Sequence, residues 1–193
     1  MGRIIAGVAG GLALKSVPGD ATRPTTDRVK EALFSRLETY GVFDGGRVLD
    51  LYAGSGALGV EAASRGARAA VLVEQAPKAV AACQANAGLV NRKLGRDAVA
   101  VRRGSVDAFL EAEAATGRGW DLVLMDPPYP LGEAALAQTL ARRVPVLDRG
   151  AVVVLERSTR SPEPAWPAGV VRFAERKYGE TTLWFAEPVE PGP

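Results

Sequence analysis

The sequence predicts an α/β protein with a Rossmann-like, doubly wound and mostly parallel sheet of seven strands, preceded by a small N-terminal β-hairpin and helix. Three observations carry this prediction. Short apolar stretches alternate with helical stretches between residues 47 and 156, a pattern typical of parallel sheets covered by helices on both faces. A glycine-rich turn follows the first of these strands, and two further strand-like stretches follow a proline-rich loop. Sheets of this kind bind ligands at the carboxyl ends of their strands.

The N-terminal part of the chain predicts a small extension ahead of the sheet. Glycines interrupt the apolar residues between Arg3 and Lys15, which favours two short strands around glycine turns. Apolar residues at helical spacing predict a helix over 27–39, capped by a threonine or an aspartate. The expected division of the chain is 1–40 for the extension at the active-site mouth, 41–187 for the main domain and 188–193 for a disordered tail.

The remaining elements follow from two periodicities. Short apolar runs predict buried strands, and longer stretches with apolar residues at helical spacing predict helices. Their regular alternation indicates strand–helix–strand units and therefore a parallel sheet. The strands are expected at 48–52, 70–74, 98–103, 122–125 and 151–156, the helices at 57–65, 77–93, 106–114 and 133–143, and a hairpin-like pair at 170–176 and 181–186.

The amino-acid composition limits which side chains are available for catalysis and metal binding. The chain has 193 residues, 47% hydrophobic and 24% charged, with a formal net charge of +2, which is typical of a soluble globular protein. Its apolar stretches are shorter than the roughly 18 residues of a membrane span, and its start lacks a signal-peptide layout. One cysteine and no histidine exclude a disulfide framework and the usual zinc ligands. We expect a cytoplasmic protein without a metal, whose chemistry rests on carboxylates, backbone groups and aromatic rings.

The turn after the first strand reads Asp50-Leu-Tyr-Ala-Gly54-Ser-Gly56-Ala-Leu-Gly59. Its glycines fit the G-x-G-x-x-G pattern of dinucleotide-binding turns, and Glu74 ends the second strand where an acid would hold a ribose. Asp50 argues against a dinucleotide, because a carboxylate there opposes a pyrophosphate but suits a cationic amino-acid tail. S-adenosylmethionine carries an ammonium, a sulfonium and a ribose. The turn therefore predicts this cofactor, bound by Asp50, Gly54, Ser55, Gly56, Glu74 and Gln75.

The fourth strand ends in Asp126-Pro127-Pro128-Tyr129, which suits methyl transfer to an exocyclic amine. The lone pair of such an amine is delocalised into the ring, so two acceptors aimed at its N–H groups help to expose it. Asp126 and the carbonyl of Pro127 can be these acceptors. Pro128 stiffens the turn because it has a fixed φ and no N–H, and Tyr129 can stack on the base. This is catalysis by positioning and electrostatics.

Motifs outside these two turns resemble one family. The chain contains Arg23-Pro-Thr-Thr-Asp-Arg28, Arg3-Ile-Ile-Ala-Gly and Glu175-Arg-Lys-Tyr-Gly-Glu-Thr181. With both turns, these stretches resemble the RsmD family of 16S rRNA guanine-N2 methyltransferases over nearly the whole chain. The resemblance implies methylation of N2 of guanine 966, with S-adenosylmethionine as donor, on an assembled or assembling small ribosomal subunit rather than on free RNA. We expect the protein to be a monomer.

The resemblance also implies roles for further residues. Thr25 and Thr26 would lie beside the methionine end of the cofactor, while Asp126, Pro127 and Tyr129 would hold the guanine. Residues expected to bind the RNA substrate are Arg3, Lys15, Arg23, Arg28 and Pro128. Further phosphate contacts, each of which would make RNA binding salt-dependent, are expected from Lys30, Arg157, Arg160, Arg176 and Lys177.

The sequence departs from the family pattern at two places. Relatives often carry basic residues in the N-terminal hairpin, whereas residues 4–14 are uncharged here, so the contribution of this hairpin to RNA binding stays open. Relatives often place Asp or Asn for the adenine amine in the turn after the third strand. This turn reads Gly104-Ser-Val106, followed by Asp107. We assign the adenine edge to Ser105 and Val106, with Asp107 as the alternative.

Other functions stay open from the residues alone. Related motifs occur in DNA adenine-N6 and protein glutamine methyltransferases, but long target-recognition insertions would favour DNA, and Asn in place of Asp126 would favour glutamine. A non-catalytic RNA-binding or assembly factor would not need an intact Asp126 and glycine turn. A dinucleotide oxidoreductase would not need Asp-Pro-Pro-Tyr.

Overall fold

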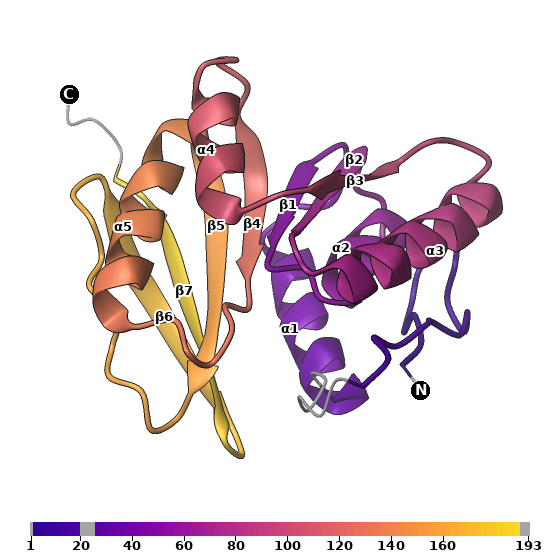
Figure 1. Ribbon diagram of the computed structural model, residues 1–193, viewed down its shortest axis with the longest axis horizontal. Helices are drawn as coiled ribbons and strands as arrows, with labels where there is room; N and C mark the ends of the chain where they lie inside the picture. The colour runs from indigo at the N-terminus through magenta and orange to yellow at the C-terminus, as the bar shows by residue number, and fades with distance from the viewer. Residues whose placement is uncertain (1, 20–25, 190–193) are drawn as a thin grey trace.

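Seven strands form one sheet in the computed structural model, which describes residues 2–19 and 26–189 (Figure 1). They are β1 (Arg47–Leu51), β2 (Ala69–Glu74), β3 (Val99–Arg103), β4 (Trp120–Met125), β5 (Leu147–Ser158), β6 (Val170–Tyr178) and β7 (Thr181–Pro188). Their order is β3-β2-β1-β4-β5-β7-β6. β1 to β5 are parallel, and β7 runs antiparallel between β5 and β6. The order and directions confirm the predicted fold class.

Helices cover both faces of this sheet. They are α1 (Asp27–Thr39), α2 (Ala57–Ser64), α3 (Pro77–Leu94), α4 (Val106–Ala114), α5 (Glu133–Arg143) and the short 3-10 helix η1 (Val144–Val146). α1, α2 and α3 pack on one face, and α4 and α5 on the other (Figure 1). In β4, Leu122 and Leu124 face the first core, and Val123 and Met125 face the second, as in a strand buried on both faces. Within the described residues, no helix is long and apolar enough to cross a membrane.

β5 extends beyond its predicted range at both ends, and its start shows why. It begins at Leu147, which pairs with Trp120 of β4. The register then shifts between Trp120 and Leu122, and the strand passes through an exposed stretch that ends at Gly150. These exposed polar residues and the glycine are typical of a turn in sequence, but pairing with β4 makes them part of a strand.

The N-terminal segment, residues 2–15, differs from its sequence prediction. The two expected strands are reduced to one antiparallel bridge between Arg3 and Ala13. Beside this bridge, the Ile4 N–H donates to the Leu12 carbonyl at 2.9 Å and the Leu14 N–H to the Gly2 carbonyl at 2.8 Å, whereas other backbone donors of the segment bond to a side chain of α2. The N–H groups of Ile5 and Ala6 donate to the Glu61 carboxylate at 2.8 and 3.1 Å. A buried charge requires such partners, and a contact 55 residues away is invisible to local patterns.

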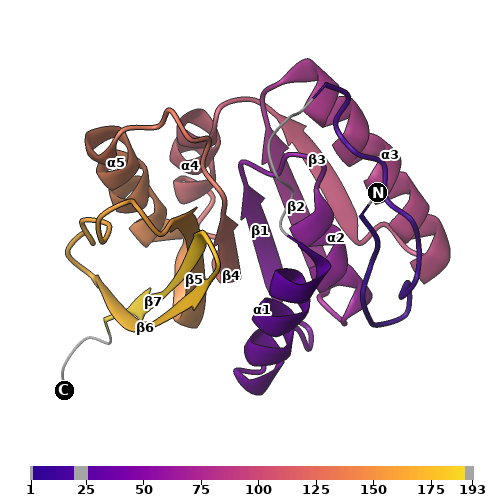
Figure 2. The same cartoon turned by 90° about the horizontal axis from the view of Figure 1, so that it is seen from below.

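Gly7 allows the N-terminal segment to lie directly on α2. Its φ is +83°, and a Cβ there would lie 2.0 Å from the Ser64 carbonyl oxygen. The Ser64 hydroxyl donates to the Ala6 carbonyl at 2.6 Å and accepts from the Ala9 N–H at 2.9 Å. Figure 2 shows the segment running beside α2 and α3. The segment is therefore packed onto the main domain and shares its core.

The fold brings the two predicted site turns together. β1 and β4 are neighbours, and Leu51 pairs with Met125, so the chain leaves both strands at the same level of the sheet. From β1 it continues to α2 on one face, and from β4 to α5 on the other. This divergence is the topological switch point, where open α/β sheets bind their ligands.

Candidate active site

The turn after β1, here called the glycine loop (residues 52–56), has an unusual backbone. Tyr52, Gly54 and Gly56 have φ values of 60°, 58° and 79°. Space also excludes a side chain at the last of these positions, because a Cβ on Gly56 would lie 2.6 Å from Cδ1 of Leu72. Gly56 is the N-cap of α2, so the unpaired N–H groups of the first helical turn begin directly after the loop.

Side chains from β2 and α3 hold the glycine loop in place. Glu74 accepts a hydrogen bond from the Gly54 N–H at 2.9 Å, and the Cys83 thiol donates to the Gly54 carbonyl at 3.1 Å. The amide of Asn86 donates to the Ser55 carbonyl at 2.8 Å. These bonds come from the chain's own side chains and preorganise the loop for binding, which lowers the entropy cost of association.

Asp50 lies beneath the glycine loop and is only 2% exposed. One carboxylate oxygen accepts from the Gly59 N–H at 2.8 Å, which satisfies a backbone donor in the first turn of α2. Burial, helped by the negative charge of Glu74, raises the pKa of Asp50 to about 8. A cationic group bound nearby would favour the ionised form. Asp50 therefore supports the first turn of α2, and its carboxyl group also favours a positively charged ligand group nearby.

Glu74 ends β2 at the same edge of the sheet. Besides the Gly54 N–H, it accepts from the N–H groups of Gln75 at 2.8 Å and Ala76 at 2.9 Å. A carboxylate offers about four acceptor positions, so capacity remains for a ligand hydroxyl. Its half-buried position beside the loop fits a ribose.

The turn after β4 presents the predicted acceptors and the predicted ring. Pro127 is buried, whereas Tyr129 is 86% exposed. The Pro128 carbonyl accepts from the Leu131 N–H at 2.9 Å and so stabilises the turn. Among the described residues, no backbone N–H bonds to the Pro127 carbonyl. This carbonyl therefore keeps its capacity to accept a hydrogen bond, and the Tyr129 ring is open to solvent.

Asp126 begins this turn and combines an exposed edge with a crowded environment. The surrounding protein raises the pKa of its carboxyl group well above the usual range, and the charges of Glu156 and Asp50 act in the same direction. Arg157, which also pairs with Glu133, opposes this shift. Three acids thus converge at the switch point, where they favour N–H donors and cations over anions.

The two candidates for the adenine edge have different surroundings. Ser105 lies in the turn after β3 and caps α4, its hydroxyl accepting from the Ala108 N–H at 3.2 Å. Val106 is buried. Asp107 instead faces α5, where it accepts from the Thr139 hydroxyl at 2.8 Å and lies 3.2 Å from Arg142. Asp107 thus joins two helices, while Ser105 remains the polar side chain of the turn itself.

The residues predicted from the N-terminal motifs are distributed around α1. Thr26 caps this helix and accepts from the Val29 N–H at 3.3 Å, and Arg28 is exposed in its first turn. Arg3 pairs with Asp27 at 3.4 Å. Lys15 is exposed and lies at the end of the N-terminal segment. Arg23 and Thr25 lie outside the described residues.

Asn86 is a site residue that the sequence interpretation missed. It is fully buried, and its amide bonds to the Ser55 carbonyl and to both the N–H and the carbonyl of Lys15. One side chain therefore joins the glycine loop to the N-terminal segment. A signal was present, since Asn86 is the polar member of the buried stripe of α3 that includes Cys83 and Val90.

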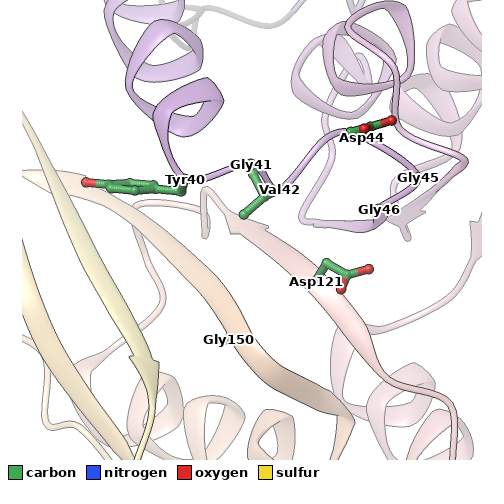
Figure 3. Close-up of a pocket in the computed structure, with 8 residues that line it drawn as sticks. All are labelled: Tyr40, Gly41, Val42, Asp44, Gly45, Gly46, Asp121 and Gly150. Carbon is green, nitrogen blue, oxygen red and sulfur yellow. The ribbon is translucent and has the colours of Figure 1, made fainter.

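A separate cavity of about 160 Å³ lies at the opposite edge of the sheet (Figure 3). It is lined by the loop after α1 and by residues at the amino ends of β4 and β5, including Asp121 and Gly150. The Asp121 carboxylate accepts from the Arg47 N–H at 2.7 Å, which joins the starts of β1 and β4. This cavity is therefore not part of the candidate active site.

The strand order, with the glycine loop and the Asp-Pro-Pro-Tyr turn at the switch point, defines a Rossmann-like class I methyltransferase fold. The chain belongs to the family described as Conserved hypothetical protein 95, whose profile matches residues 2–187. This membership, together with relatives named small subunit methyltransferase D, confirms the resemblance to the RsmD family.

Similar proteins cover almost the whole chain. It is 36% identical over 179 residues to "Putative rRNA methyltransferase YlbH" of Bacillus subtilis (strain 168), covering 93% of this chain and 95% of the relative. It is 34% identical over 178 residues to "Ribosomal RNA small subunit methyltransferase D" of Escherichia coli (strain K12), covering 92% and 85%. The solved structure of "Putative methyltransferase yhhF from Escherichia coli" matches with a TM-score of 0.80 at 30% identity, covering 96% of this chain and 97% of that one.

Proposed function

We propose that this protein transfers a methyl group from S-adenosylmethionine to the exocyclic N2 of a guanine in small-subunit rRNA. The observation that carries the proposal is the turn Asp126 to Tyr129 beside the glycine loop, where the Pro127 carbonyl accepts from no backbone N–H of the described residues and the Tyr129 ring is exposed. The names of the relatives support rRNA as the substrate. The resemblance to RsmD extends the proposal to guanine 966, a cytoplasmic location and a monomeric enzyme acting on the small subunit.

The chain's own groups suit an exocyclic amine. The Asp126 carboxylate and the Pro127 carbonyl accept from the two N–H groups of guanine N2, which localises the nitrogen lone pair and holds it for in-line attack. Tyr129 stacks on the base and fixes its plane. As the new C–N bond forms, positive charge develops on the nitrogen, and the nearby carboxylates stabilise it. The excess proton leaves to Asp126 or to water.

The site also suits the cofactor. When bound, S-adenosylmethionine supplies a methyl group on a positively charged sulfur. Glu74 would hold the ribose hydroxyls with its remaining acceptor capacity, the backbone of residues 54–56 would lie against the cofactor, and Ser105 and Val106 would meet the adenine edge. Thr25 and Thr26 would lie beside the methionine end. Asp50 would favour the cationic amino-acid tail through its charge.

Methyl transfer to competing substrates tests the proposal. Tritiated S-adenosylmethionine is incubated with unmethylated small subunits, naked 16S rRNA and DNA in parallel, and the labelled nucleoside is identified. We expect label in the subunits, as N2-methylguanine. Label in DNA adenine without label in subunits would establish the alternative DNA adenine-N6 activity. Binding to subunits without any transfer would point to a non-catalytic assembly factor.

A further inference from the structure

Aromatic and basic side chains gather where the end of α1 meets β6. β6 residues Ala174 and Arg176 pair with Phe185 and Leu183 of β7, and these partners belong to the core beneath α1. Arg176 therefore lies on the α1 face of the sheet. The aromatic–basic strip defined here consists of Arg36, Tyr40, Phe173, Arg176 and Tyr178.

Arg36 is a stacked cation that has no acidic partner in the described part of the chain. Its guanidinium lies 5.7 Å from the Tyr40 ring centroid and 5.2 Å from that of Phe185. Its Nε is buried without an acceptor, and within the described residues no carboxylate lies within ion-pair distance of this guanidinium. Stacking fixes the plane of the group, while its charge stays uncompensated.

The other face of the same strands provides a contrast. Arg172 also stacks on a ring, with its guanidinium 5.5 Å from the Trp184 centroid. It is compensated by two carboxylates, Glu163 at 2.9 Å and Glu175 at 3.5 Å. An arginine stacked for structural reasons thus has acidic partners here, whereas Arg36 has none among the described residues.

Phe173 adds an exposed ring to the strip. It lies at an irregularity of β6, between Arg172 and Ala174, and is 38% exposed. Its ring is 5.6 Å from Tyr40 in an edge-on arrangement and 6.2 Å from Phe185. Bulges often re-aim a side chain, and this one turns a large aromatic ring towards solvent beside a free cation.

The strip begins at the edge of the sheet that carries the active site. β6 is parallel to β5, and the turn after Tyr178 bonds to the end of β5 through the Thr159 N–H and the Glu180 carbonyl at 2.9 Å. From Tyr178 back to Phe173 the strip runs roughly 16 Å, at about 3.3 Å per residue. In Figure 2, α1 lies on the face of the sheet opposite α4 and α5, and β7 and β6 form the end of the sheet.

We propose that the aromatic–basic strip binds a single-stranded stretch of RNA that adjoins the target guanine; this inference rests on the proposed function. Single-stranded RNA requires aromatic faces for its bases and uncompensated cations for its phosphates, and the strip supplies both. N2 of a guanine can be reached only when the base is unstacked. Binding of the neighbouring RNA stretch to the strip holds the guanine in this unstacked state.

Direct RNA binding tests this assignment independently of catalysis. The affinity of the full chain for a fluorescein-labelled 12-nucleotide oligouridylate is measured by anisotropy at several salt concentrations, for wild type, Phe173→Leu, Arg36→Gln and Arg176→Gln. Phe173→Leu should raise Kd about tenfold through lost stacking. Each arginine variant should raise Kd and reduce the salt slope by about one. The matched control, Arg172→Gln on the opposite face, should leave both quantities unchanged.

Two results would overturn the assignment. One is wild-type-like oligonucleotide binding by Phe173→Leu and both arginine variants on the α1 face. The other is that the variants bind the oligonucleotide as wild type does but bind intact subunits more weakly. This result would mean that the strip contacts a ribosomal protein. Affinity for S-adenosylhomocysteine reports folding, and the exposed Arg176→Gln variant keeps the test valid if Phe173→Leu fails to fold. Absence of methyl transfer by wild type, with strip-dependent RNA binding intact, would refute the proposed function alone.

Discussion

Asp126 shows how environment prepares a common side chain for an uncommon task. Its carboxyl group keeps an exposed edge at the end of β4, while surrounding atoms and Glu156 raise its pKa. The chain has no histidine, so proton acceptance in the proposed reaction falls to this group or to water. A carboxyl with a raised pKa is a better proton acceptor than an ordinary one.

Replacing Asp126 with alanine should separate catalysis from cofactor binding. The variant loses an acceptor for the amine and the nearest negative charge, so kcat should fall about 100-fold or more. Affinity for S-adenosylhomocysteine should change little, because Glu74 and the glycine loop stay intact. Single-turnover methyl transfer and titration calorimetry give the two quantities. Undiminished turnover would remove the role assigned to Asp126.

Asp50 predicts a pH dependence of stability. The carboxyl ionises at its ordinary pKa of 3.8 in the unfolded chain and at about 8 in the folded one. Between these values the folded protein binds a proton that the unfolded chain has lost, so stability falls as pH rises. Asp50→Asn cannot ionise. The free energy of unfolding of this variant, relative to wild type, should therefore increase from pH 5 to pH 8 in urea titrations. A pH-independent difference would contradict the assignment.

At the scale of elements, α3 ties the glycine loop and the N-terminal segment into one unit. Asn86 makes three bonds to backbone groups of both. Asn91, on the same helix, makes two similar bonds to Val99 of β3. Both asparagines bond to backbone groups through their side-chain amides. Asn86 contacts the glycine loop and Asn91 contacts β3, so Asn91 is a matched control for Asn86.

Alanine at either position should lower stability by about 1–3 kcal/mol, because buried backbone groups lose their partners. Asn86→Ala alone should also weaken S-adenosylhomocysteine binding, by about tenfold, since the Ser55 carbonyl loses its support. Calorimetric titration of both variants, with urea unfolding as the common reference, measures the difference. Equal affinities in the two variants would show that Asn86 acts on the fold without acting on the loop.

Two glycines of the N-terminal segment allow a similar comparison. Gly7 and Gly11 have nearly the same φ, +83° and +84°, but a Cβ on Gly7 would meet Ser64 at 2.0 Å, and one on Gly11 would meet nothing within 4 Å. Gly11→Ala should cost about 1 kcal/mol of stability from backbone strain. Gly7→Ala should cost about 1–3 kcal/mol more from overpacking. Equal losses in thermal unfolding would mean that close packing on α2 contributes little.

Local signals explain which elements the sequence predicts well. The helices at 27–39, 106–114 and 133–143 have the expected bounds, because caps and apolar spacing are local properties. The N-terminal hairpin is shorter than the two predicted strands because Glu61, far along the chain, accepts from the N–H groups of Ile5 and Ala6. The two site turns follow strands and so could be located from sequence. The place of Asn86 in the buried stripe of α3 marks it as unusual, but its bonding partners could not be predicted, since they depend on how α3 packs.

At the scale of the whole molecule, the two proposed ligand regions lie at one edge of the sheet and its adjoining face. The switch point gathers acids that suit a cationic cofactor and an amine, while the aromatic–basic strip gathers cations that suit phosphates. A net charge of only +2 gives weak overall attraction to RNA. Recognition must therefore come from the local arrangement of groups.

Ligand-induced stabilisation tests the switch point as a cofactor site. S-adenosylhomocysteine at 100 times its Kd should stabilise the fold by about 2.7 kcal/mol, seen as a higher Tm. NAD at the same concentration should have no effect, because Asp50 and the other acids disfavour a pyrophosphate. A Tm that rises with NAD and not with S-adenosylhomocysteine would indicate that the glycine loop binds a dinucleotide.

The packing of the N-terminal segment has a consequence for how the chain is made. Ile5 bonds to Glu61, 56 residues later, and Lys15 bonds to Asn86, 71 residues later. At ribosomal rates of about 5–20 residues per second, the partner of Lys15 is synthesised roughly 4–14 seconds after Lys15 itself. The N-terminal segment thus leaves the ribosome well before the helices that hold it in place, and Ile4 and Leu14 stay uncovered until α2 and α3 have followed.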